Sequence, residues 1–258
     1  MSKRWEKPTI QQNSFNMKNL FTKKAGVGTI CASDTQVNGI YYDFDKTTQT
    51  ATVTYRGDSF DSYDNEYSGA VIIPSSVSYD GITYSVTTIG NEAFYKCSSL
   101  TSVTIPNSVT SIGEWAFWGC SSLTSVTINS DAILNKDYSS ADNLKKIFAS
   151  QVTEYIIGPT VKGIGKYAFY ECSDLTSVTI GNCMTSIGWG AFSCCERLTS
   201  VVCYAQYPPM LVLESDVFAP KTYKGTLRVP CDALEAYKAD ILWGQFTNIV
   251  CIEDEIAD

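Results

Sequence analysis

The sequence predicts a single β-rich solenoid with an N-terminal β cap and a second cap at its C-terminal end. Three observations carry this prediction. A segment of about 23 residues occurs in four clear copies, each copy contains an alternating apolar pattern, and 258 residues with 44% hydrophobic content can bury a large core. No stretch approaches the ~18 consecutive apolar residues that a membrane-spanning helix needs, so we expect no transmembrane segment.

Residues 1–36 predict a flexible basic leader. Residues 1–30 hold six basic side chains and one acidic one, without a sustained apolar period. Met17–Lys24 resembles the basic start of an export signal, but the apolar stretch at 25–33 is short and broken by glycine. An unstructured N-terminus is favoured. A degraded or truncated export signal, with Cys31 as the relic of a lipidation site, stays open.

Residues 37–85 predict the N-terminal β cap. Apolar and polar residues alternate along this segment, and Gly-Asp and Asp-Gly pairs at 57–58 and 80–81 are typical of turns. Such β-hairpins would close the first coil and protect its edge.

Residues 86–205 predict the solenoid. The copies begin at Ile89, Ile112, Ile164 and Ile187 with Ile-Gly-x-x-Ala-Phe, continue to a cysteine and end in Leu-x-x-Val. The interval from Ile112 to Ile164 equals two periods plus six residues, which predicts a degenerate copy between them. Its apolar marks are Leu144, Ile147 and Phe148.

Each copy predicts one strand and one returning limb. In the first copy, period-2 alternation directs Val103 and Ile105 inward, and Ser102 and Thr104 outward. Phe94 of the returning limb would then enter the core. Each coil buries its apolar face only against its neighbours, so the stack needs covered ends.

Residues 206–258 predict the C-terminal cap. Pro208-Pro209 interrupts the repeat, and the segment from Asp232 to Lys238 predicts a short helix with Asp232 as its N-cap.

The sequence of the repeats resembles that of a known family. Residues 99–117 read Ser-Leu-Thr-Ser-Val-Thr-Ile-Pro-Asn-Ser-Val-Thr-Ser-Ile-Gly-x-x-Ala-Phe, which is similar to the BspA-type leucine-rich repeat. Residues 37–42 and 68–74 resemble that family's usual N-terminal segment, and residues 227–238 and 248–250 its usual C-terminal cap. The resemblance spans about residues 37–252 and implies a leucine-rich repeat solenoid. It also implies a place at the surface of gut or oral anaerobic bacteria, although the leader departs from the family's export signal.

Cysteines recur at one repeat position. Parallel side chains on neighbouring coils point the same way, so we expect buried, reduced thiols rather than disulfides. No Cys-x-x-Cys pair occurs, which argues against a structural zinc site. One local disulfide among Cys183, Cys194, Cys195 and Cys203 stays open as an alternative. The repeat-position cysteines are Cys97, Cys120, Cys172 and Cys195.

Composition excludes several kinds of chemistry. The chain has no histidine, which removes Ser-His-Asp and Cys-His catalysis and every imidazole metal site. Its net charge of −8 disfavours nucleic-acid binding. Gly163–Ala168 formally matches a dinucleotide fingerprint, but the repeat already explains it. The acids near Asp58 lack the spacing of an EF-hand loop. We therefore expect no enzyme, no cofactor and no metal.

Two surfaces are candidate contact sites. The outward hydroxyls of the strands form a polar ladder without a titratable partner, which suits a glycan or an extended peptide. The residues after the core phenylalanines form an aromatic row that offers rigid contact area, unless these rings only cover the returning limb. The ladder candidates are Ser102, Thr104, Ser125, Thr127, Ser177 and Thr179, and the row candidates are Tyr95, Trp118 and Tyr170.

Arg56-Gly57-Asp58 spells an integrin-type cell-attachment tripeptide. A solvated turn is the favoured interpretation, because Asp and Glu residues crowd this segment and a given tripeptide occurs by chance in a few per cent of chains.

The expected function is non-catalytic recognition of host proteins or glycans at the cell surface or outside the cell, an expectation that rests on the family resemblance. The alternative is a cytoplasmic scaffold for protein–protein interactions, because buried reduced thiols suit a reducing compartment. Oligomeric state is left open.

Overall fold

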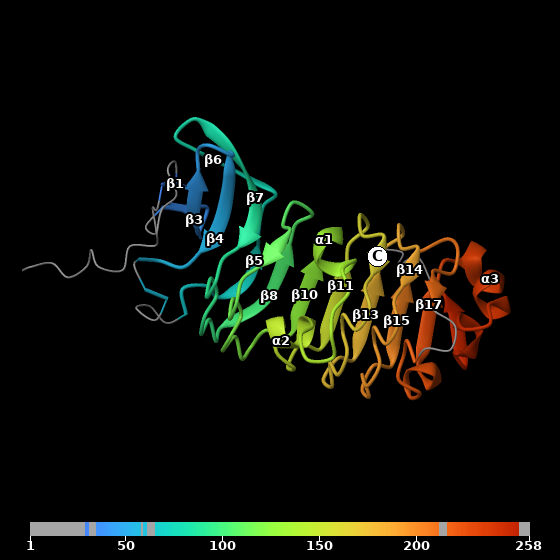
Figure 1. The fold of residues 1–258 in the computed structure, drawn as a ribbon. Helices are drawn as coiled ribbons and strands as arrows, with labels where there is room; N and C mark the ends of the chain where they lie inside the picture. Colours follow the sequence, from blue (N-terminus) through green and yellow to red (C-terminus); the bar gives the residue numbers. More distant parts are fainter. Residues whose placement is uncertain (1–28, 31–34, 58, 61–64, 212–215, 253–258) are drawn as a thin grey trace, which may run out of the picture.

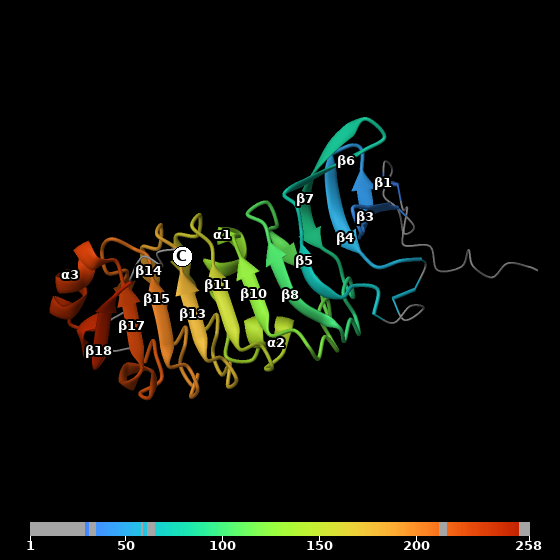
Figure 2. The same cartoon turned by 180° about the vertical axis from the view of Figure 1, so that it is seen from behind.

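The computed structural model describes residues 29–30, 35–57, 59–60, 65–211 and 216–252. The chain forms an elongated stack of coils, with a small mixed sheet at one end and a short helical cap at the other (Figures 1 and 2). The predicted leucine-rich repeat solenoid with an N-terminal β cap is therefore confirmed.

The coils share one long parallel sheet, which has eight strands among the described residues. Every pair from β8 to β18 keeps its register without a bulge, so equivalent repeat positions lie side by side. In order along the sheet the strands are β5 (Gly69–Ile72), β8 (Leu100–Ile105), β10 (Ser125–Ile128), β11 (Glu154–Ile157), β13 (Ser177–Ile180), β15 (Ser200–Cys203), β17 (Thr226–Val229) and β18 (Asn248–Cys251).

The returning limbs form much shorter strands. Strand β9 (Ser111–Ile112) pairs with the end of β7 (Ile82–Ile89). Further along, β12 (Gly163–Ile164), β14 (Ser186–Ile187) and β16 (Met210–Leu211) form a separate parallel sheet. Strand β16 directly follows Pro208-Pro209, so the stack continues beyond the interruption that these prolines predict.

The degenerate copy is the longest coil in the regular part of the stack. Ser102 pairs with Ser125 after one 23-residue period, whereas Glu154 pairs with Ser125 and lies 29 residues after it. The extra length forms α1 (Asp131–Leu134), α2 (Leu144–Phe148) and the segment between them. The predicted apolar marks are confirmed, since Leu144 and Phe148 are fully buried and Ile147 packs partly buried against the core.

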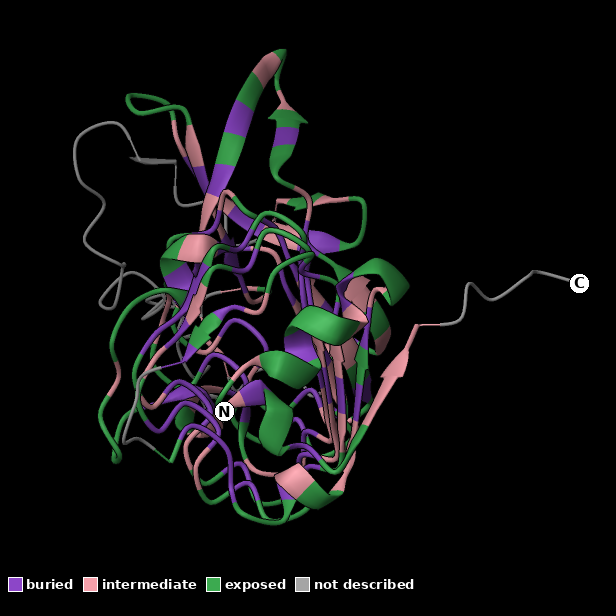
Figure 3. Cartoon of the chain, turned by 90° about the vertical axis from the view of Figure 1, so that its right-hand side faces the viewer, coloured by how far each residue is buried: buried purple, intermediate pink, exposed green. Residues whose placement is uncertain are grey.

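The core is a column of rings and thiols inside the coils, where buried segments face each other in the view along the stack (Figure 3). Phe94 and Phe117 stack with ring centroids 4.9 Å apart, and Phe192 lies 4.8 Å from Phe169 and 5.3 Å from Phe218. The prediction that Phe94 enters the core is thus confirmed, and the same holds for its repeat equivalents.

The four repeat-position cysteines are free and buried, as predicted. Burial raises the pKa of the Cys97 thiol to about 11 and that of Cys120 and Cys172 to about 12. The Sγ of Cys120 donates to the Phe94 carbonyl at 3.1 Å, and the Sγ of Cys195 donates to the Phe169 carbonyl at 3.0 Å. Cys120 and Cys195 therefore each tie their coil to the one before it.

The N-terminal cap is built from hairpins, as the alternating pattern predicts. Strand β3 pairs antiparallel with β1, β2 and β4, and β6 pairs antiparallel with β7. Strand β4 also runs parallel to β7, which joins the cap to the returning limbs of the solenoid. The remaining bounds are β1 (Thr29–Ile30), β2 (Gln36–Val37), β3 (Ile40–Asp45), β4 (Thr50–Thr54) and β6 (Ser76–Tyr79).

The C-terminal end is covered by short helices around a buried Trp243, whose Nε1 donates to the Pro209 carbonyl at 2.7 Å. The prediction that Asp232 caps a helix is wrong. Asp232 lies inside a 3-10 turn, and the helix that follows begins without a side-chain cap because that turn already directs the chain into it. The elements are η2 (Thr222–Lys224), η3 (Cys231–Ala233), α3 (Leu234–Ala239) and η4 (Trp243–Gln245).

A disulfide joins Cys231 to Cys251, whose Cα atoms lie 4.5 Å apart. The sequence did not indicate this pair. It forms because the parallel pairing of β17 with β18 sets Cys251 opposite Val229, two residues before Cys231. The alternative of a local disulfide among Cys183, Cys194, Cys195 and Cys203 is wrong, since all four thiols are free.

Candidate functional site

The outward hydroxyls of β8, β10 and β13 lie in register on the open face of the long sheet. Ser102 is opposite Ser125, and Thr104 is opposite Thr127. Their neighbours along each strand, such as Val103 and Val126, are fully buried, while the hydroxyl residues are half-buried. The hydroxyl ladder, as we name this set, consists of Ser102, Thr104, Ser125, Thr127, Ser177 and Thr179.

The ladder is not free of titratable groups, and the expectation that it lacks a titratable partner is wrong. Strand β11 of the degenerate coil lies between β10 and β13, and it inserts Glu154 between Ser125 and Ser177. The Oγ of Ser125 donates to Glu154 Oε2 at 2.9 Å. The sequence analysis did not identify Glu154 because its strand lacks the Leu-x-x-Val motif of the other copies.

The same face continues toward the C-terminal end through residues that sequence reasoning missed. Ser200, Thr226 and Asn248 extend the serine row, and the Asn248 amide donates to Thr226 Oγ1 at 3.0 Å. Val202 and Arg228 extend the threonine row, and Ile156 interrupts it between Thr127 and Thr179. The face therefore combines hydroxyl and amide groups with aliphatic area and two charges of opposite sign. Alignment of each later segment with the repeat, in the register that the strands share, could have identified these positions from the sequence.

The aromatic row is only partly formed. Tyr95 and Trp118 stack with centroids 4.9 Å apart and planes 14° apart. Tyr170 does not join them and instead makes an edge contact with Tyr167. The expectation of one continuous row is wrong because the coil between Trp118 and Tyr170 carries helix α2, which ends at the core Phe148 and is followed by Ala149 in place of an aromatic residue.

A cleft of about 750 Å³ lies beside Trp118, and we name it the insertion cleft. One wall comes from residues 112–115 with Trp118, and the other from residues 136–139 with Asp142, Lys146 and Ile147. Trp115 and Trp118 are 61% and 52% exposed, which is unusual for side chains of this size. The six extra residues of the degenerate copy were the sequence signal for this feature.

The far wall of the insertion cleft is fixed by hydrogen bonds. The Tyr138 hydroxyl donates to the Ile133 carbonyl at 2.7 Å, and burial raises its pKa far above the usual tyrosine value, so it stays a neutral donor. Asp137 Oδ1 accepts from the Lys166 N–H at 3.0 Å. A Cβ at Gly165 would collide with the Lys136 carbonyl, so only glycine allows this close approach.

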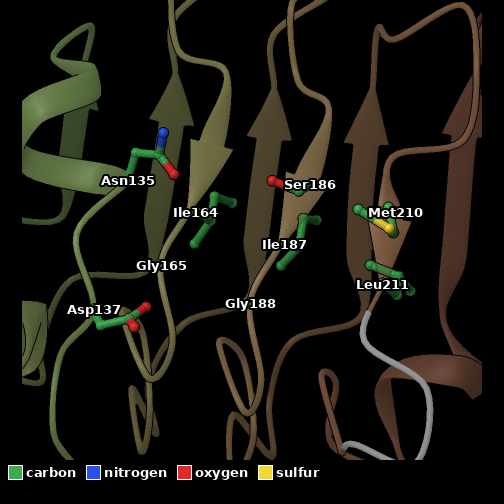
Figure 4. A pocket seen from close by; sticks show the side chains of 9 residues that line it. All are labelled: Asn135, Asp137, Ile164, Gly165, Ser186, Ile187, Gly188, Met210 and Leu211. Carbon is green, nitrogen blue, oxygen red and sulfur yellow. The ribbon is translucent and has the colours of Figure 1, made fainter.

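A second cavity of about 600 Å³ lies on the other side of the same segment (Figure 4). Asn135 and Asp137 flank it on one side, and Ile164, Ile187 and Leu211 from three neighbouring return strands line its floor. The two cavities share Asp137, so residues 135–138 form a partition between them.

The cell-attachment tripeptide stays a prediction, because Asp58 lies outside the described residues. Arg56 is exposed, and its backbone N–H donates to Glu66 Oε1 at 2.7 Å. Gly57 has a φ of 75°, a conformation typical of a turn glycine.

The part of the chain that the structure describes contains no group of three or more Cys, Asp and Glu side chains placed to hold a metal ion. Within the same residues, no helix is both long and apolar enough to cross a bilayer.

Comparison with known proteins identifies the repeats. The family model described as "BspA type Leucine rich repeat region (6 copies)" matches residues 75–157 and 145–219, more than half of the chain. No curated protein matches the chain.

Solved structures of bacterial leucine-rich repeat proteins are also similar. The Treponema pallidum leucine-rich repeat protein is 28% identical over 66% of this chain and 71% of its own, with a TM-score of 0.41. A Bacteroides capillosus protein is 24% identical over 67% and 99% of the two chains, with a TM-score of 0.34. A leucine-rich cell surface protein of Faecalibacterium prausnitzii is 18% identical over 85% and 74%, with a TM-score of 0.31.

Proposed function

The chain belongs to the BspA-type leucine-rich repeat family, and from this premise we propose that it recognises a host or neighbouring-cell protein or glycan at the cell surface or outside the cell. Repeats of this family are typically binding scaffolds without catalysis. The specific role that we propose is adhesin-like.

The observation that carries the proposal is the continuous register of the hydroxyl ladder. Serine positions from β8 through β15 lie directly opposite one another, with Glu154 as the one departure. Strands stack at about 4.8 Å, so the rows repeat donors and acceptors at a fixed spacing. A ligand with its own repeating hydrogen-bonding groups, such as a glycan chain or an extended peptide, fits such a surface.

The absence of imidazole from the sequence supports binding without catalysis. The Ser125 hydroxyl does contact a carboxylate, Glu154, but it donates to an oxygen at the open face of a sheet, and neither residue lines the insertion cleft or the second cavity. Acid–base catalysis needs its groups to converge on an enclosed substrate.

The disulfide between Cys231 and Cys251 supports an extracellular location. Disulfides persist in oxidising compartments and are rare in the cytoplasm. The alternative, a cytoplasmic interaction scaffold, is favoured by the buried reduced thiols at Cys97, Cys120 and Cys172. Burial protects those thiols in either compartment, whereas Cys231 is exposed and its bond is open to reductant. The disulfide is therefore the more discriminating observation.

The test is a binding screen of the purified chain against arrayed mucin glycans and extracellular-matrix proteins. Saturable binding to members of one ligand class supports the adhesin-like role. The cytoplasmic scaffold replaces the adhesin-like role under two joint conditions. No ligand on either array binds, and the chain captures a protein from the same cell in a way that ladder substitutions abolish.

A further inference from the structure

The backbone ladder of the returning limbs is broken between the second copy and the degenerate coil. In regular coils, each limb donates to the next, as Glu92 N–H does to the Glu114 carbonyl and Tyr167 N–H to the Trp189 carbonyl, both at 3.0 Å. The next donor position behaves alike, with Phe94 N–H bonded to the Ala116 carbonyl at 2.8 Å. The equivalent N–H groups of Trp115 and Phe117 have no hydrogen-bond partner among the described residues.

The insertion causes this break. Tyr138 and Leu144 occupy the donor positions of the degenerate coil, because their N–H groups bond the Lys166 and Ala168 carbonyls at 2.8 and 3.0 Å. In a regular coil the second donor lies two residues after the first, whereas Leu144 lies six residues after Tyr138. The degenerate coil therefore pairs with the coil that follows it. The longer segment between Tyr138 and Leu144 cannot also lie against Trp115 of the preceding coil. The insertion cleft is the space that remains.

Two indole rings border this space. Tyr95 covers one face of the Trp118 ring at 4.9 Å, and Trp118 lines the cleft beyond that stack, so its other face is directed away from Tyr95 toward the insertion. Trp115 makes no ring contact within the described residues and is 61% exposed. Its positive φ of 55° is a property of the repeat, since Glu92 and Tyr167 share it, and indicates no special role for this residue.

The charges around the cleft nearly cancel. Glu114, Asp137 and Asp142 line it together with Lys136 and Lys146. Asp142 is paired with Lys146 at 3.3 Å, and the Lys136 ammonium lies 4.8 Å from the centre of the Tyr138 ring. The Glu114 carboxylate is exposed and has no partner within the described part of the chain. The cleft therefore presents acceptors and donors without a strong field of either sign.

We propose that the insertion cleft is a second binding site, separate from the hydroxyl ladder, and that it takes a neutral saccharide. A sugar ring has flat apolar faces that pack on exposed indoles, and hydroxyls that both donate and accept. The backbone N–H of Trp115 would donate to a sugar oxygen, and the Glu114 carboxylate would accept from sugar hydroxyls. This site goes beyond the proposed function, which places recognition on the other side of the coil.

The other ligand classes fit less well. A polyanion needs a net basic surface, which the near balance of charges does not provide. A peptide that adds as a β-strand needs a longer edge than β9, which has two residues.

The test is isothermal titration of the full chain with neutral tetrasaccharides of glucose, galactose, mannose and N-acetylglucosamine, with tryptophan fluorescence as a second readout. We expect at least one to bind saturably and to change the emission. Trp115→Ala and Trp118→Ala should each weaken binding at least about tenfold, and Trp118→Tyr should restore most of it. Glu114→Gln, which does not disturb the ring stack, should weaken binding several-fold.

Two control variants distinguish the insertion cleft from the rest of the surface. Trp189→Ala removes an exposed indole outside the cleft and should leave binding unchanged. Ser99→Lys/Ser122→Lys/Ser173→Lys, which adds three cations at exposed turn positions outside the cleft, should also leave tetrasaccharide binding unchanged. The proposal is overturned if no tetrasaccharide binds, or if binding survives Trp115→Ala, Trp118→Ala and Glu114→Gln alike.

Discussion

The Ser125 hydroxyl donates to the Glu154 carboxylate at 2.9 Å, across the boundary between a regular coil and the degenerate one. Both side chains are half-buried on the open face of the sheet. The bond links the longest coil to its neighbour at the position where the serine rows would otherwise continue unbroken.

Removal of this bond should weaken the fold modestly. We expect Ser125→Ala and Glu154→Ala each to lower the free energy of unfolding by about 1 kcal/mol, with a coupling energy of similar size in the double mutant. Urea unfolding of the four proteins measures this directly. Strict additivity of the two single effects would mean that the contact contributes nothing to stability.

The ring column should be a principal source of stability. Phe192 packs between Phe169 and Phe218, so Phe192→Ala leaves a cavity that neither neighbour can fill and should cost about 3–5 kcal/mol. Phe192→Leu keeps most of the volume and should cost less than about 2 kcal/mol. Equal losses for both variants in urea unfolding would contradict a packed column.

Much of this architecture could be predicted from sequence. The apolar Val103 and the polar Ser102 alternate in the sequence as their inward and outward positions alternate in the sheet. Phe94 and Cys97 lie in the core, as their repeat positions predict. These positions are predictable because each coil repeats the same local solution.

The residues that escaped prediction belong to coils that break the repeat. Tyr155 takes the place of valine in β11, and its ring centroid lies 4.7 Å from that of Phe169. The strand beginning at Glu154 therefore lacks the sequence motif of the other repeat strands. The path of the segment after Asn135 is set by bonds to Lys166, a contact between coils that no local pattern encodes. The bond between Cys231 and Cys251 likewise depends on strand pairing, and ten cysteines leave the pairing open in sequence.

The buried thiols should make the fold sensitive to alkali. Burial raises the pKa of Cys120 from about 9 to about 12, so above pH 9 the thiol loses its proton in the unfolded chain but keeps it in the folded one. The native state then binds more protons, and stability falls as pH rises. From pH 9 to pH 10, we expect the wild type to lose up to about 1.4 kcal/mol more than Cys120→Ala. Parallel slopes for the two proteins in urea unfolding would show that this thiol does not cause the loss.

The disulfide should stabilise the C-terminal end. It closes a span of 20 residues, for which a loss of about 2–4 kcal/mol on reduction is expected. A mild reductant should therefore lower the melting temperature of the wild type but not that of Cys231→Ala/Cys251→Ala. If the wild type melts alike with and without reductant, the bond does not contribute to stability.

The hydroxyl ladder is the proposed contact face, and lysine substitution is the sharpest test of that role. Ser102→Lys/Ser125→Lys/Ser177→Lys places three long cations on the ladder, where their half-buried positions allow them to extend into solvent without disrupting the core. Ser99→Lys/Ser122→Lys/Ser173→Lys adds the same charge at exposed turn positions before the strands. The measurement is the affinity of both variants and the wild type for the strongest ligand of the binding screen, by surface plasmon resonance. We expect the ladder variant to lose binding while the turn variant retains it and both melt like the wild type. Equal affinity in all three proteins would contradict a contact role for the ladder.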